Sequence, residues 1–256
     1  MNAITLVVPC YNEAARLDGA ALVGLVDAHA ALRLLLVDDG STDRTAERLR
    51  TLAAERPTRI ELLALPANGG KAEAVRQGLQ HALAGGVDVV GYFDADLSTP
   101  PPEILRLVQT IDASGVAVVM GARVALLGRD IRRRAARHYL GRIFATTASI
   151  MLGVRVYDTQ CGAKLFRRTP ALVAALERPF RSRWAFDVEL LGRLLSAGLP
   201  IETFVEVPLM TWRDVPGSKL NVTRMGRAYC DLLLIGMAHR RREKKGGPGG
   251  PPSDRT

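Results

Sequence analysis

Two aspartates, Asp94 and Asp96, follow the apolar stretch VVGYF, and three prolines begin four residues after the second aspartate. If the apolar stretch is a strand, both carboxylates point to the same side, because side chains alternate along a strand. Carboxylate oxygens that leave coordination positions open suit Mg²⁺ or Mn²⁺ held partly by the phosphates of a bound molecule. The alternative is an Asp-rich turn that caps the following helix, and the spacing alone does not separate the two.

The segments that would position these carboxylates alternate between strand and helix patterns. We expect strands at residues 3–9, 32–39, 59–65, 87–96 and 116–123. We expect helices at residues 13–31, 41–55, 69–84 and 101–113, with Ser41 able to cap the second and Pro in the first turn of the fourth. This alternation predicts an α/β fold with a mostly parallel, twisted central sheet and helices on both faces.

Polar motifs stand where four of these strands end. They are PCYNE (residues 9–13), DDGSTD (38–43), NGGK (68–71) and DADLS (94–98). Ligands of parallel sheets bind outside the carboxyl ends of the strands. We therefore expect all four motifs to line one crevice.

In this order and spacing, the motifs VVPCYNE, LLVDDGSTDRT, NGGKAEAVRQG and FDADLSTPP resemble family 2 glycosyltransferases with the GT-A nucleotide-sugar fold. The later motifs DTQCGAKLFRR (158–168), RWAFDVELL (183–191) and VPGSKLN (215–221) are similar to those of dolichyl-phosphate glucosyltransferases and bacterial polyprenyl-phosphate glycosyltransferases. The resemblance covers residue 4 to about residue 235. It implies an inverting, metal-dependent transfer of a hexose from a nucleotide sugar, expected to be a UDP-hexose, to polyprenyl phosphate.

The resemblance also assigns residues to the donor and the metal. Those expected at the nucleotide sugar are Pro9, Tyr11, Glu13, Asp39, Lys71, Asp94 and Arg123, and those expected at Mg²⁺ or Mn²⁺ are Asp94 and Asp96. Asp39 can accept a hydrogen bond from a base N–H or a ribose hydroxyl, or can simply form an Asx turn. Lys71 is either a phosphate contact or a solvated lysine, and Ser98 is either a further metal ligand or a turn cap.

The acceptor decides whether a general base is needed. A hydroxyl must lose a proton to a carboxylate, whereas a phosphate monoester is largely anionic at neutral pH and needs positioning by cations. Lys164, Arg213 and Lys219 are expected at the acceptor phosphate. Asp158 and Asp187 are the two candidate catalytic carboxylates, with Asp158 preferred and Asp187 alternatively orienting the site.

The 256-residue chain carries a net charge of +9 and three widely spaced cysteines without a CxxC pattern. Sparse cysteines, no signal-peptide pattern and no apolar run of about 18 residues predict a cytoplasmic protein without a spanning helix. Basic-apolar segments at residues 131–154 and 224–245 predict peripheral binding to an anionic membrane surface or to a membrane partner, although each also fits a core helix with a basic end.

We expect three parts: a glycosyltransferase domain (1–220), an amphipathic C-terminal helix (221–242) and a disordered tail (243–256). Two rival functions are transfer to a saccharide or protein hydroxyl and a nucleotide-binding scaffold without turnover. Nucleic-acid binding is not expected, because no aromatic residues interleave with the basic segments.

Overall fold

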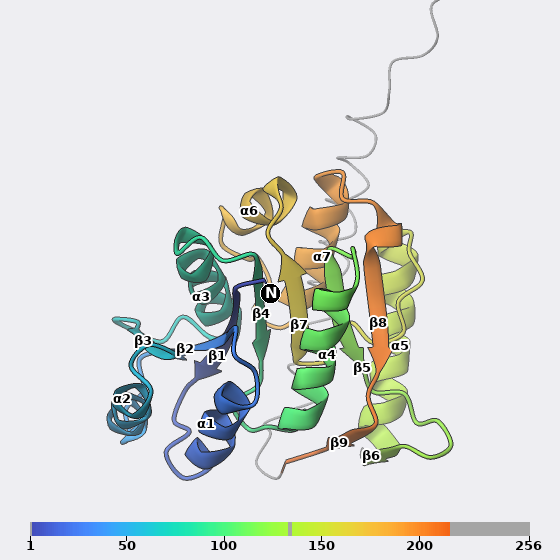
Figure 1. Ribbon diagram of the computed structural model, residues 1–256. Coiled ribbons are helices and arrows are strands. Elements are labelled where there is room, and N and C mark those ends of the chain that lie inside the picture. The colour runs from blue at the N-terminus through green and yellow to red at the C-terminus, as the bar shows by residue number, and fades with distance from the viewer. Residues whose placement is uncertain (1, 133–134, 216–256) are drawn as a thin grey trace, which may run out of the picture.

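The computed structural model describes residues 2–132 and 135–215 (Figure 1). Within these ranges a seven-stranded sheet has the order β3-β2-β1-β4-β7-β5-β8, and a two-stranded sheet pairs β6 with β9. The strands are β1 (Ile4–Cys10), β2 (Leu32–Asp38), β3 (Ile60–Ala64), β4 (Val89–Phe93), β5 (Val118–Ala122), β6 (Asp130–Arg132), β7 (Ala163–Arg167), β8 (Phe204–Pro208) and β9 (Thr211–Arg213).

The large sheet is parallel except at one strand. β1 pairs in parallel with β2 and β4, β2 with β3, and β5 with β8. β7 runs antiparallel to both of its neighbours, β4 and β5. The predicted mostly parallel α/β fold is therefore confirmed, while the reversed strand in its centre was not among the expected elements.

Helices cover both faces of the large sheet, as predicted. They are α1 (Gly19–Asp27), α2 (Thr45–Glu55), α3 (Lys71–Ala84), α4 (Pro101–Ala113), α5 (Ala135–Leu152), α6 (Pro170–Leu176) and α7 (Phe186–Ser196), followed by the 3₁₀ turn η1 (Ile201–Thr203). One core packs α3, α5, α6 and α7 on one face, and a second core packs α1, α2 and α4 on the other. Alternate residues of each inner strand enter the two cores, which is why these strands are apolar on both sides.

Two helices begin later than the sequence suggested. α1 starts at Gly19, where the Asp18 carboxylate accepts from the Ala21 N–H, and not at residue 13. α2 starts at Thr45, so Ser41 is not its N-cap; the Ser41 hydroxyl instead accepts from the Asn12 N–H at 3.1 Å. The polar residues that precede each helix form hydrogen bonds with loop residues. They therefore lie outside the helices themselves.

α3 lies unusually close to the sheet because Gly78 faces it. A Cβ at Gly78 would lie 2.5 Å from Cγ1 of Val7 and 3.0 Å from Cγ2 of Val37, and both valines are fully buried. Any larger residue would push α3 away from β1 and β2. Since α3 begins at the candidate site, its distance from the sheet also fixes the position of Lys71.

We therefore expect Gly78→Ala to lower the free energy of unfolding by about 1–3 kcal/mol through overpacking. Gly24→Ala in α1, where a Cβ would meet nothing within 4 Å, is the matched control. It should raise stability by about 0.5–1 kcal/mol, because Ala loses less backbone entropy in a helix than Gly. Urea denaturation measures both changes, and equal midpoints for the two variants would contradict the close packing of α3.

Candidate active site

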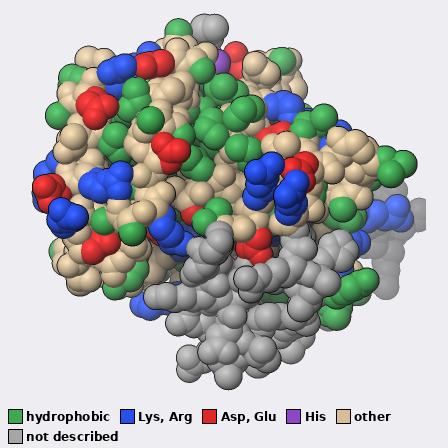
Figure 2. Space-filling view, turned by 90° about the horizontal axis from the view of Figure 1, so that it is seen from below, with side chains coloured by type: hydrophobic (Ala, Val, Ile, Leu, Met, Phe, Trp, Pro, Cys, Tyr) green, Lys and Arg blue, Asp and Glu red, His purple; other side chains and the backbone are tan. Residues whose placement is uncertain are grey.

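The carboxyl ends of β1, β2 and β4 meet at one edge of the large sheet, and the predicted motifs lie there. In Figure 1 this edge is at the bottom, beside β6, β9 and the start of α4. Figure 2 looks onto it: Lys and Arg side chains lie next to Asp and Glu side chains on its described part. The structure thus confirms that the strand ends assemble charged groups in one place.

The first two loops are tied to each other by hydrogen bonds. The Asn12 side chain accepts from the Thr42 N–H at 2.9 Å, and the Glu13 N–H donates to the Thr45 hydroxyl at 2.8 Å. Asn12 has a φ of 54°, a left-handed conformation that costs energy for a non-glycine residue. The bonds to the second loop hold it there, and the preceding residue, Tyr11, is 44% exposed just after the carboxyl end of β1.

Asp39 joins the second loop to the third. Its carboxylate accepts from the N–H of Gly69 at 2.7 Å and of Gly70 at 2.8 Å, and from the side-chain amide of Asn68 at 3.1 Å. Burial raises the pKa of Asp39, and the two backbone hydrogen bonds partly oppose that rise. The carboxylate of neighbouring Asp38 accepts from the Ser41 N–H, three residues further on, at 3.2 Å. Asp39 therefore holds the start of α3, and its contact with a nucleotide stays a prediction.

Asp94 is held between two elements. One carboxylate oxygen, Oδ1, forms an ion pair with the Lys71 ammonium at the start of α3. A Cβ built at Gly162, just before β7, would lie only 2.1 Å from the other oxygen, Oδ2. A glycine is thus required at residue 162 for β7 to pass so close to this carboxylate.

Asp96 lies in a tight turn two residues further on. Its Oδ1 accepts from the Ser98 N–H at 3.0 Å, and Leu97 between them has a φ of 52°. Glu13 is close by: burial raises its pKa, its bond to Arg16 lowers it, and the charges of Asp96 and Asp94 raise it further. Ser98 belongs to this turn through its N–H, while its carbonyl accepts from the Arg213 N–H at 3.2 Å.

The carboxylates of Asp94 and Asp96 fit a divalent cation that is completed by another ligand. They are hard oxygen donors at a partly exposed edge, and Lys71 forms an ion pair with one oxygen of Asp94. The described residues contain no cluster of three or more His, Cys, Asp or Glu that could hold a metal by itself. Such a two-carboxylate site matches Mg²⁺ or Mn²⁺ shared with phosphate oxygens.

Asp158 and Arg123 form a nearly buried ion pair. Arg123 donates from Nε to Oδ2 at 2.7 Å and from Nη2 to Oδ1 at 2.8 Å, and its backbone N–H adds a third bond at 3.1 Å. The Gln160 N–H also donates to Asp158. Although burial opposes it, the charge of Asp158 raises the pKa of Arg123 above its ordinary value. The guanidinium lies 5.2 Å from the ring centre of Trp212.

Asp187, in the first turn of α7, is the centre of a second buried group. Its Oδ1 accepts from the Lys164 ammonium at 2.6 Å and from the Tyr92 hydroxyl. Lys164 also donates to the Cys161 carbonyl at 2.6 Å. Burial, followed by the charge of Asp187, raises the pKa of Tyr92 well above its ordinary value, so the phenol keeps its proton and donates it.

The three residues predicted to bind the acceptor phosphate differ in where they lie. Lys164 has no exposed surface, so in this conformation it contacts Asp187 and not a molecule in the crevice. Arg213 is 68% exposed at the side chain and pairs with Asp130 at 3.1 Å. Lys219 lies outside the described residues, as do the predicted C-terminal helix and tail.

Sequence reasoning did not assign roles to Arg183, Gly162 or Tyr92. The exposed Arg183 guanidinium lies beside Gly70, with Nε 3.9 Å from a Cβ built there, and its charge counteracts the raised pKa of Asp39. Arg183 stands in the RWAFDVELL motif, which was a usable signal. Gly162 and Tyr92 gave none, because their roles depend on strands that are distant in sequence.

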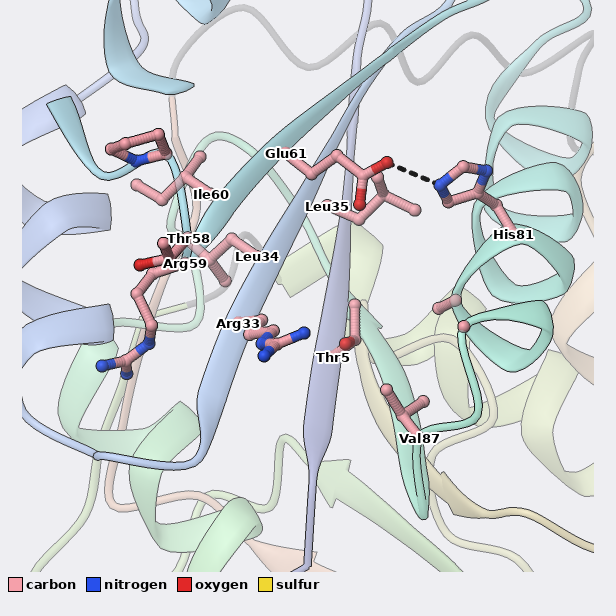
Figure 3. Close-up of a pocket in the computed structure, with 13 residues that line it drawn as sticks. Thr5, Arg33, Leu34, Leu35, Thr58, Arg59, Ile60, Glu61, His81 and Val87 are labelled. Carbon is pink, nitrogen blue, oxygen red and sulfur yellow. Dashed lines mark hydrogen bonds and ion pairs between the residues drawn. The ribbon is translucent and has the colours of Figure 1, made fainter. Parts of the chain in front are cut away.

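A separate pocket of about 260 Å³ lies near the amino ends of β1, β2 and β3 (Figure 3). Glu61 and His81 point toward each other across it and pair at 2.7 Å. Thr5 and Arg33 also line it. None of the predicted site residues does, so this pocket is distinct from the group of carboxylates at the carboxyl ends of the strands.

The fold is that of GT-A glycosyltransferases. The crystal structure of glucosyl-3-phosphoglycerate synthase from Mycobacterium tuberculosis with Mn²⁺, UDP and glucosyl-3-phosphoglycerate matches with a TM-score of 0.66 and 22% identity, over 93% of this chain and 80% of that one. At this identity the likeness concerns the fold.

The chain belongs to glycosyl transferase family 2, whose model matches residues 5–172. It is 32% identical to a dolichyl-phosphate beta-glucosyltransferase of Trichomonas vaginalis, over 92% of this chain and 71% of that protein. The dolichyl-phosphate beta-glucosyltransferase of Saccharomyces cerevisiae is 30% identical over 92% and 75%. The polyprenol monophosphomannose synthase of Mycolicibacterium smegmatis is 29% identical over 92% and 87%. The predicted family and enzyme class are thereby confirmed.

The buried ion pair makes a prediction about stability. Lys164→Met should lower the free energy of unfolding by about 3–5 kcal/mol, because it leaves the Asp187 charge buried without its cation. The double variant Lys164→Met/Asp187→Asn should recover part of that loss.

Arg132→Met is the control, since it removes a cation from an exposed ion pair with Asp130. It should change stability by less than about 0.5 kcal/mol. Chemical denaturation monitored by circular dichroism compares the variants. A loss for Lys164→Met no larger than that of Arg132→Met would show that the pair is not buried as described.

Proposed function

We propose that the protein transfers a hexose from a nucleotide sugar, a UDP-hexose, to polyprenyl phosphate, with inversion at the anomeric carbon and with Mg²⁺ or Mn²⁺. Three relatives support the acceptor class, because two are named dolichyl-phosphate beta-glucosyltransferases and the third is named a polyprenol monophosphomannose synthase. The solved structure with UDP and Mn²⁺ supports the donor and the cation.

The observation that carries this proposal is that both candidate bases, Asp158 and Asp187, are paired with cations. Asp158 accepts two bonds from the Arg123 guanidinium, and Asp187 accepts one from the Lys164 ammonium. A carboxylate paired with a cation is a weak base, because the pair stabilises the ionised form. A hydroxyl acceptor would need such a base, whereas a phosphate monoester is already an anion. The geometry therefore favours a phosphate acceptor.

The remaining residues take the following proposed roles. Pro9, Tyr11, Glu13 and Asp39 bound the nucleotide end, and Asp94 and Asp96 hold the cation. When bound, the cation would neutralise charge on the departing nucleoside diphosphate. Arg123, Arg213 and Lys219 provide positive charge for the phosphates of donor and acceptor. Asp158 acts by orienting Arg123, and Lys164 by fixing Asp187.

Polyprenyl phosphate and polyprenol of the same chain length form a matched pair of acceptors that test the proposal. With UDP-hexoses and Mn²⁺, transfer should occur to the phosphate and not to the alcohol. The rate should be flat from about pH 8 to pH 7 and fall as the pH drops through the second pKa of the phosphate ester, near 6. Radiolabelled lipid product measures the rate.

A different result would identify the rival acceptor. Transfer to polyprenol or to a soluble saccharide, with a pH limb that disappears in Asp187→Asn, would assign Asp187 as a base for a hydroxyl. Thermal shift with several nucleotide sugars and Mn²⁺ identifies the donor independently of the acceptor. The two parts of the proposal can therefore fail separately.

A lipid acceptor also requires contact with a membrane, and we propose that this contact is peripheral. Among the described helices, none is both long and apolar enough to cross a bilayer. On α5, Tyr139, Ile143 and Ile150 are 69%, 55% and 66% exposed, and their spacing puts them on one face of the helix. Leu127, in the loop before β6, is fully exposed. Apolar side chains on the outside of a basic protein suit an anionic membrane surface.

The variant Ile143→Ser/Ile150→Ser should bind vesicles of phosphatidylglycerol and phosphatidylcholine about tenfold or more weakly, because each isoleucine contributes roughly 2 kcal/mol when buried. Val173→Ser on α6, 44% exposed, is the control and should bind as wild type does. Vesicle co-sedimentation at low and high salt measures the binding. If the α5 variant binds as tightly as the control, α5 does not face the membrane.

A further inference from the structure

The Lys71 ammonium lies beside Asp94, one of the two carboxylates proposed to hold the divalent cation. The ammonium forms an ion pair with Asp94 Oδ1 and lies 5.9 Å from the ring centre of Phe186. Asp187 and Asp96 also lie close enough to interact electrostatically with the same ammonium. One ammonium thus interacts with three surrounding carboxylates.

The Lys71–Asp94 pair differs from the other two ion pairs of the site in its exposure. The side chains of Lys71 and Asp94 are 40% and 31% exposed. Those of Lys164 and Asp187 are 0% and 7% exposed, and those of Arg123 and Asp158 are 12% and 7%. Exposed ion pairs contribute little to stability and exchange readily, whereas breaking a buried pair is costly. Of these three ion pairs, the Lys71–Asp94 pair is therefore the easiest to break.

Asp94 is also fixed in place independently of Lys71. Gly162 lies against its Oδ2, and the Leu97 N–H bonds to its backbone carbonyl at 3.1 Å. When the ammonium leaves, the carboxylate therefore keeps its position and its charge. Lys71, on a long flexible side chain in the first turn of α3, can move without disturbing the helix.

We propose that Lys71 is a resident counter-ion that occupies the position of the divalent cation on Asp94, and that the cation displaces it only together with a nucleoside diphosphate. A cation alone must compete with the ammonium for Asp94. A diphosphate brings oxygens that complete the coordination of the cation and negative charge that accepts the released ammonium. Lys71 thereby couples cation binding to nucleotide binding. This inference rests on the proposed metal-dependent function.

Binding of Mn²⁺ alone, followed by electron paramagnetic resonance of the free ion, tests the inference without turnover. Wild type should bind Mn²⁺ weakly and gain affinity strongly when UDP is added. Lys71→Met should bind Mn²⁺ alone at least tenfold more tightly than wild type and should show a smaller gain on adding UDP. Lys71→Arg, which keeps the charge, should behave as wild type.

Two further variants locate the effect. Arg50→Met removes one positive charge from an exposed position on α2 and should leave Mn²⁺ affinity unchanged. Lys71→Met/Asp96→Asn should lose the gained affinity, because the ion then lacks one carboxylate. Melting temperatures give a second readout: Lys71→Met should melt lower in EDTA than wild type and be raised more by Mn²⁺ alone.

The outcomes separate this inference from the proposed function. If Lys71→Met binds Mn²⁺ alone no more tightly than wild type, yet binds UDP with Mn²⁺, the counter-ion role is wrong and the donor assignment stands. If Lys71→Met gains Mn²⁺ affinity but neither protein binds UDP, the counter-ion role stands and the nucleotide donor is wrong.

Discussion

Neutralisation of negative charge at the carboxyl edge of the sheet is the constraint on which the rest of the site depends. Asp94, Asp158 and Asp187 each have a cation of their own, respectively Lys71, Arg123 and Lys164. The partners are distant in sequence, by 23 residues or more in each case, so each pair forms only when the sheet and helices are assembled. The charges of the site therefore act as restraints on the fold as well as groups for chemistry.

These pairings also divide the carboxylates by function. In the two buried pairs the carboxylates of Asp158 and Asp187 already accept hydrogen bonds from cations, which suits the positioning of an anionic acceptor better than proton abstraction. Asp94 and Asp96 face solvent more and have fewer donors around them, and this leaves them able to take a cation. Burial, rather than residue type, thus distinguishes the two aspartates that are paired inside the protein from the two that remain open to a cation, since all four have the same side chain.

The sequence predicted the parallel part of the fold and the residues at its strand ends, because strand–helix alternation and the polar motifs are local patterns. It did not predict β7 or the pairing of Arg123 with Asp158, since neither is visible within a short window. Lys164 shows the difference most clearly: it was expected at the acceptor phosphate because of its positive charge, but the strand turns its side chain inward. Ser41 likewise is of a residue type that often caps helices, but its hydroxyl instead accepts a hydrogen bond from the Asn12 N–H.

The antiparallel strand β7 explains why the Lys164–Asp187 part of the site could not be predicted from short sequence motifs. β7 lies between β4 and β5 with Lys164 opposite Tyr92 on one side and opposite Met120 on the other. This register turns Lys164 and Phe166 to the face covered by α7, and Ala163 and Leu165 to the opposite core. A slip of one residue would exchange the two faces, moving the ammonium away from Asp187 and placing a bulkier residue than Gly162 against Asp94. The register of this single antiparallel strand therefore sets both the buried Lys164–Asp187 ion pair and the position of the Asp94 carboxylate.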